Sequence, residues 1–183
     1  MAAGAGAEPL LVEERIMQDM SETANKTLAD KTWVLTLTSV ASFMVALDAL
    51  VVTTALSTIR IDLGASIEAL EWTVNAYNLS FAVLLLTGAA LGDRLGRRCM
   101  FAAGLTLFVV ASAACALAGN IGALIAARAV QGAGAALVMP LAMALLSAVF
   151  PREERAKALG IFSAVTGLAL IAGPVAEIGR AHV

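Results

Sequence analysis

Residues 72–91 read WTVNAYNLSFAVLLLTGAAL, residues 92–98 read GDRLGRR, and residues 99–117 read CMFAAGLTLFVVASAACAL. The two flanking runs hold no charged residue, and each reaches the length of about 17–25 residues that a bilayer-spanning helix needs. Strands of a membrane barrel would alternate in hydrophobicity, and these runs do not. The stretch therefore predicts a helical hairpin in a membrane, closed by a short basic loop.

The composition of the whole chain agrees with a membrane protein. Of its 183 residues, 60% are hydrophobic and 14% are charged, whereas soluble domains carry about 25% charged residues. This excludes a soluble enzyme, a disordered chain and a disulfide-stapled secreted domain. The net charge of −2 offers no basic excess for nucleic acid, and we expect no cofactor and no metal ion. We interpret Cys99 and Cys115 as small apolar residues.

Five apolar spans follow an acidic amino-terminal segment. They are Val34–Leu56, Trp72–Leu91, Cys99–Leu117, Ile121–Val149 and Ala158–Ala176. The sequence thus predicts an all-α polytopic membrane protein, with about five transmembrane helices within residues 32–176. Residues 1–31 are predicted to form a mostly disordered tail with a short helix around Leu10 to Met20.

The distribution of lysine and arginine predicts the orientation of these spans. The loops on one side carry eight basic residues: Lys26, Lys31, Arg94, Arg97, Arg98, Arg152, Arg155 and Lys157. The other side carries only Arg60. Because cytoplasmic loops are enriched in basic residues, we expect a multi-pass protein of the plasma or inner membrane whose amino terminus is cytoplasmic.

The loop at residues 92–98 is the most distinctive feature. Gly92 and Gly96 are expected to allow a tight turn between two helices, and Asp93 to accept hydrogen bonds from N–H groups at the start of the next helix. Arg94, Arg97 and Arg98 surround this single acid. A basic loop that only sets topology remains an alternative.

Two charged residues lie deep in apolar spans, Asp48 in the first and Arg128 in the fourth. Such residues are costly in hydrocarbon and are therefore functional candidates. At 1.5 Å per residue, Asp48 lies about 12 Å and Arg128 about 10 Å below the same membrane surface. We therefore predict that they face each other, with Gln131 on the same helix face as Arg128. A purely structural ion pair is the alternative.

Asn75 and Asn78 share one face of the second span, since they stand at positions i and i+3. They could line a polar pathway, or they could bond to a neighbouring helix. The residues alone slightly favour the second interpretation.

Several segments together resemble the major facilitator superfamily. The loop Gly92–Arg98 resembles its signature between helices 2 and 3, and LIAARAVQGAG at residues 124–134 resembles its helix 4 signature. Leu47-Asp48 resembles part of the helix 1 signature of its drug:proton antiporters. WTVNAY at residues 72–77 resembles helix 2 of the fourteen-helix antiporter branch. Parts of the helix 5 antiporter signature are matched by Gly160, Gly173 and Pro174.

The resemblance implies the amino-terminal part of a proton-coupled exporter of drugs or other amphipathic compounds. Asp48, Arg128 and Gln131 would couple proton and substrate, and the loop Gly92–Arg98 would gate the cytoplasmic side. Asn75 and Asn78 would line the cavity. Partners would be the lipid bilayer, protons, a small-molecule substrate and further carboxyl-terminal helices of the same protein. A nutrient uniporter or symporter, a small self-assembling exporter and a non-transporting membrane scaffold remain alternatives.

The carboxyl end departs from that resemblance. Residues 177–183 read EIGRAHV, where the helix 5 signature leads us to expect two glycines. These seven residues match the translation of a common short-read sequencing adapter, so we expect a non-native tail at 177–183. Resequencing the source locus with long reads tests this expectation, and finding the seven codons in place would refute it.

Overall fold

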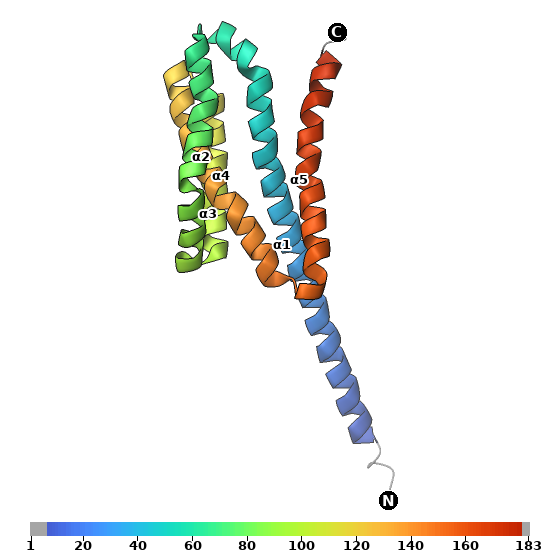
Figure 1. Cartoon of the computed structure of the whole chain (residues 1–183). Coiled ribbons are helices and arrows are strands. Elements are labelled where there is room, and N and C mark those ends of the chain that lie inside the picture. Colours follow the sequence, from blue (N-terminus) through green and yellow to red (C-terminus); the bar gives the residue numbers. More distant parts are fainter. Residues whose placement is uncertain (1–6, 181–183) are drawn as a thin grey trace, which may run out of the picture.

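The computed structural model describes the backbone of residues 7–180 and the side chains of Met20 and residues 28–169. This part of the chain is a bundle of five helices joined by short turns (Figure 1). The helices are α1 (Ala7–Asp62), α2 (Ile67–Leu95), α3 (Arg97–Ala116), α4 (Ile121–Val149) and α5 (Arg152–Arg180). The predicted all-α fold is confirmed.

Four of the predicted spans are confirmed, because α1, α2, α3 and α4 are long and apolar enough to cross a membrane. The carboxyl-terminal side chains of α5 lie outside the described residues, so its crossing stays a prediction. Capping residues fix the starts of α2 and α4, so that α2 begins ahead of its apolar run while α4 has the predicted bounds. Ser66 accepts a hydrogen bond from the N–H of Ala69, and Asn120 accepts one from Ala123.

The structure differs from the prediction at the amino-terminal segment. The backbone from Ala7 to Lys31 is helical and runs without a break into the first span, instead of being mostly disordered. After Pro9 the segment contains neither glycine nor proline and is rich in good helix formers. Pro9 itself falls in the first turn, where proline is tolerated. The expected tail at 177–183 lies outside the residues with described side chains.

Helix α4 is the centre of the bundle. It packs against α2 and α3 along much of its length, and its carboxyl-terminal end leans towards α1 and α5 (Figure 1). Glycines let its neighbours approach closely. A Cβ atom on Gly134 would lie 2.7 Å from the Phe108 nitrogen, and one on Gly88 would lie 2.7 Å from the Ala136 oxygen. Small residues at such crossings are how membrane helices pack.

Gly134→Val should separate α3 from α4. The new side chain would meet backbone atoms of Phe108 and Gly104, which cannot move aside as a flexible side chain can. We expect a loss of about 1–3 kcal/mol in the free energy of unfolding, measured by titrating the purified chain with denaturing detergent. Gly167→Val is the matched control, because nothing lies within 4 Å of its Cβ position. Equal stability of the two variants would contradict the packing.

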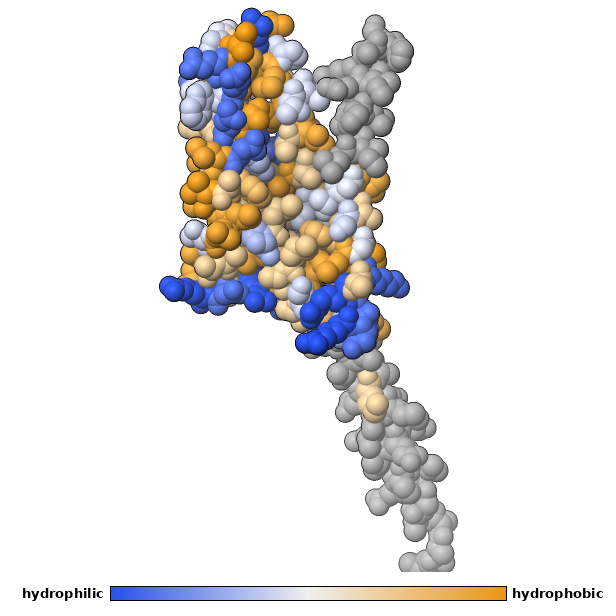
Figure 2. All heavy atoms as spheres, viewed as in Figure 1, coloured by the Kyte–Doolittle hydropathy of each residue, from blue (hydrophilic) through white to orange (hydrophobic). Residues whose placement is uncertain are grey.

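The predicted basic side of the protein forms one end of the bundle. Figure 2 shows hydrophilic residues gathered at the lower end of the helices, below a broad apolar band. Lys31 of α1 bonds Glu154 of α5 there, with Nζ 2.8 Å from Oε2. Arg155 donates from Nη2 to the carbonyl oxygens of Ser147 and Phe150 at the end of α4. These contacts tie α1, α4 and α5 together at this end.

Candidate functional site

The two intramembrane charges meet, as predicted. Arg128 Nη1 donates to Asp48 Oδ2 at 2.6 Å and to Gln131 Oε1 at 2.8 Å. Gln131 Nε2 donates in turn to Asp48 Oδ1 at 2.8 Å. The three side chains form a closed ring of hydrogen bonds between α1 and α4, which we call the charge cluster. The predicted pairing of Asp48 with Arg128 is thereby confirmed.

The side chains of the charge cluster are buried to different extents. The side chain of Arg128 is 2% exposed and that of Asp48 is 17% exposed, while Gln131 is fully buried. A buried charge in a membrane is tolerated when it is paired and hydrogen-bonded. The guanidinium of Arg128 is therefore buried inside the protein, whereas the carboxylate of Asp48 is the charged group that solvent or a ligand can reach.

Two further residues touch the cluster. The guanidinium carbon of Arg128 lies 4.4 Å from the centre of the Tyr77 ring, within range of a cation–π contact. Cys115 Sγ lies 3.5 Å from Gln131 Oε1, which is a weak thiol hydrogen bond. Four helices therefore meet at the cluster: α1, α2, α3 and α4.

Sequence reasoning missed these two residues. It interpreted Cys115 as purely apolar and left Tyr77 without a role. Tyr77 is the only tyrosine of the chain and lies within an apolar span, which was the available signal. Its approach depends on Gly132, because a Cβ there would overlap the Tyr77 backbone carbonyl.

The loop between α2 and α3 differs in detail from the prediction. Only Gly96, with φ of 97°, turns the chain. Gly92 lies inside α2, and its missing side chain makes room for Leu141 of α4. Asp93 does not cap α3. Instead its Oδ1 accepts from Arg97 Nε at 3.0 Å and from Arg97 Nη2 at 2.8 Å. Because α2 continues to Leu95, the residue that directly precedes α3 is Gly96 and not Asp93.

Arg97 also links this loop to α4. Its Nη1 lies 3.5 Å from the Ala144 carbonyl oxygen, although Arg97 is exposed like Arg94 and Arg98. The ion pair of Asp93 and Arg97 is itself largely exposed, so it contributes little to stability. The loop is thus held to the bundle by Gly92 packing and one arginine.

The remaining candidates lie on open faces. Asn75 and Asn78 are both exposed on α2, and no hydrogen bond joins either to another helix within the described part of the chain. Exposed Glu68 and Glu71 continue this stripe towards the start of α2. Gly160 is exposed on α5. The packing around Gly173 and Pro174 lies outside the described residues.

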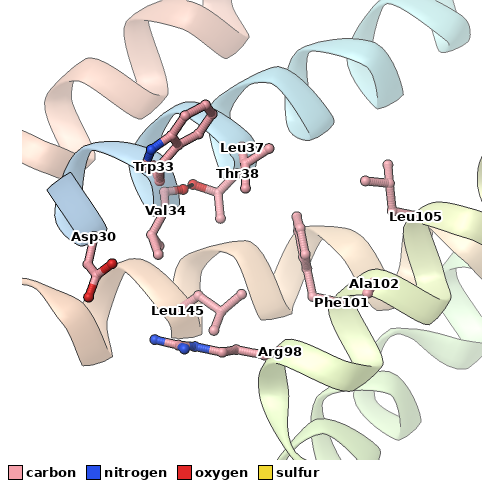
Figure 3. A pocket seen from close by; sticks show the side chains of 10 residues that line it. All are labelled: Asp30, Trp33, Val34, Leu37, Thr38, Arg98, Phe101, Ala102, Leu105 and Leu145. Carbon is pink, nitrogen blue, oxygen red and sulfur yellow. Dashed lines mark hydrogen bonds between the residues drawn. The ribbon is translucent and has the colours of Figure 1, made fainter.

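A separate apolar cavity of about 400 Å³ opens between α1, α3 and α4 (Figure 3). Its lining is Asp30, Trp33, Val34, Leu37, Thr38, Arg98, Phe101, Ala102, Leu105 and Leu145. No member of the charge cluster lines it. Among the described residues that line it, Asp30 and Arg98 are the charged ones, and both lie at the basic end of the bundle.

Comparison with known proteins identifies the family. The model of the Major Facilitator Superfamily matches residues 38–178, more than half of the chain. The chain is 40% identical over 148 residues to multidrug resistance protein Stp of Mycobacterium tuberculosis, covering 79% of this chain and 28% of that protein. It is 42% identical over 137 residues to the tetracenomycin C resistance and export protein of Streptomyces glaucescens, covering 75% and 26%.

A third relative is the cephamycin export protein CmcT of Amycolatopsis lactamdurans, which is 45% identical over 150 residues, covering 80% of this chain and 30% of that protein. The chain thus spans less than a third of the length of these curated relatives. These matches agree with the membrane-spanning helices and the buried charge pair in pointing to one family of membrane proteins. The chain belongs to the Major Facilitator Superfamily and is a multi-pass membrane protein.

Proposed function

We propose that this chain forms the amino-terminal part of a proton-coupled exporter of drugs or other amphipathic small molecules. The observation that carries the proposal is the charge cluster, in which a partly accessible carboxylate faces a fully buried cation. The printed names of the relatives describe multidrug resistance and antibiotic export. We therefore propose export on the basis of this similarity, and proton coupling on the basis of the chemistry of Asp48.

The cluster supports coupling because Asp48 has two stable partners in its ionised form and can exchange a proton at its exposed side. Protonation removes the charge that Arg128 Nη1 contacts at 2.6 Å. The arrangement of α1 and α4 then loses one of its main attractions. A bias of this kind between two conformations is what proton coupling requires.

The carboxylate is also suited to a cationic substrate. A bound cation and a proton would compete for Asp48, so that each promotes release of the other. The exposed stripe of Asn75 and Asn78 would line the substrate path, because unpaired amides facing lipid would be costly. The loop from Gly92 to Arg98 would gate the cytoplasmic side.

Alternating access needs two bundles that move around a central site, so we propose that further helices of the same protein complete the transporter. We place the basic end of the bundle and the amino terminus in the cytoplasm, with the protein in the plasma or inner membrane.

The function is tested in cells that lack their own efflux pumps and express the intact transporter. We expect lower accumulation of ethidium, a lipophilic cation, and restored accumulation when a protonophore collapses the proton gradient. Unchanged accumulation of ethidium and other amphipathic cations would overturn drug export. Uptake of a nutrient instead would favour a symporter. The absence of both export and uptake would favour a non-transporting scaffold.

The orientation is tested by cysteine labelling. In a background of Cys99→Ala and Cys115→Ser, single cysteines at exposed Asp62 and Arg94 should react from opposite sides of the membrane with an impermeant maleimide. Asp62 should label from outside, because it lies at the end opposite to the basic loops. Labelling of both from one side would contradict the assigned topology.

A further inference from the structure

The Tyr77 ring is held in a fixed position against Arg128. It is 6% exposed and stacks almost parallel on Phe81, with an angle of 4° and ring centres 6.3 Å apart. The guanidinium carbon lies 4.4 Å from its centre. A ring supported in this way presents its negative face to the cation without having to reorganise.

Arg128 uses little of its guanidinium for hydrogen bonds. Both of its bonds within the charge cluster leave from Nη1, and its buried Nε has no partner within the described part of the chain. Arginine stays charged at any physiological pH. When Asp48 takes up a proton, the cation remains buried and keeps Gln131 Oε1 and the Tyr77 face as its partners.

We propose that Tyr77 is a positioning residue that holds Arg128 in place while Asp48 is protonated. The inference rests on the proposed function, because it gives Tyr77 a part in the proton step assigned to Asp48. The ring and the carboxylate contact the guanidinium at the same time, the ring on its face and the carboxylate at Nη1. Protonation of the carboxyl group removes its attraction for the cation, so the guanidinium can settle closer to the ring and the cation–π contact strengthens. Tyr77 therefore favours the protonated form of the cluster.

Among the described residues, three side chains with titratable or charged groups surround Asp48. Arg128 of α4 faces it directly, Tyr77 of α2 faces it across the guanidinium, and Cys115 of α3 reaches it only through Gln131. The described part of α5 carries charges only between Arg152 and Lys157, at the basic end of the bundle.

The test compares Tyr77→Leu, which removes the ring, with Tyr77→Phe, which keeps it. In the intact transporter we measure ethidium transport against pH, and the infrared band of the protonated Asp48 carboxyl, assigned by its absence in Asp48→Asn. Tyr77→Leu should move both midpoints to lower pH by about one unit, a tenfold rise in the proton concentration needed. Tyr77→Phe should leave both midpoints unchanged.

Three outcomes separate the explanations. A Tyr77→Leu variant with reduced transport but unchanged midpoints would show a merely structural role and overturn the proposal. An equal shift in Tyr77→Phe would assign the effect to the hydroxyl group and also overturn it. Undiminished coupling in Asp48→Asn would defeat the proposed function instead. If Tyr77→Leu does not fold, Tyr77→Met removes the same ring and is judged by the same midpoints.

Discussion

Asp48→Asn should reduce proton-driven ethidium export by the intact transporter to the level of vesicles that lack it. Asparagine has nearly the shape of aspartate and keeps an oxygen that can accept from Arg128 Nη1, now 2.6 Å from Asp48 Oδ2. It cannot release a proton. The variant should therefore insert and fold while remaining fixed in the equivalent of the protonated state.

The measurement is ethidium transport in everted membrane vesicles, with an imposed pH gradient as the only driving force. Asp62→Asn is the matched control, because it makes the same chemical change at an exposed position in the last turn of α1. It should export like the wild type. Gradient-driven export that survives in Asp48→Asn would rule out the proton role of Asp48.

Asp48→Leu should be the most destabilising single change in the charge cluster. It leaves Arg128, which is 2% exposed, as a buried charge without its counterion, and the guanidinium cannot lose its proton. Removing one partner of a buried pair costs about 3–5 kcal/mol. Arg128→Met should cost less, because the carboxyl group of Asp48 is partly exposed and can become neutral by taking up a proton.

A double-mutant cycle measures this directly. The free energy of unfolding is obtained for the two single variants and for Asp48→Leu with Arg128→Met, each in the purified chain titrated with denaturing detergent. The double variant should recover most of the loss seen in Asp48→Leu, because no charge is then left buried. Additive losses would show that the two side chains do not stabilise each other.

The charge pair could be predicted from the sequence because the depth of a residue in the membrane follows from its position along the helix. Asp48 and Arg128 are the charges deep in the first and fourth spans, and the rise of a helix gives both the same depth. Hydropathy alone likewise located the first four spans, which correspond to α1–α4. In a membrane these signals are strong, because a charge or an interruption in an apolar run is energetically costly and is therefore rare unless it has a structural or functional role.

The remaining details depend on how the helices approach one another. Gly92 looked like a turn residue, yet it lies inside α2 and makes room for Leu141. Asp93 resembled a cap, but α2 continues past it and places it against Arg97. Tyr77 reaches Arg128 only because Gly132 lets α2 pack closely on α4. Spacing along one helix carries no information about such contacts.

Proton release on substrate binding shows whether Asp48 exchanges a proton for substrate. Tetraphenylphosphonium, a lipophilic cation, is added to the purified intact transporter in weakly buffered detergent solution, and the pH change is recorded. The wild type should release protons in proportion to the ligand bound, and Asp48→Asn should release none. A wild type that binds the cation without releasing protons, or an equal release from Asp48→Asn, would show that Asp48 does not exchange a proton for substrate.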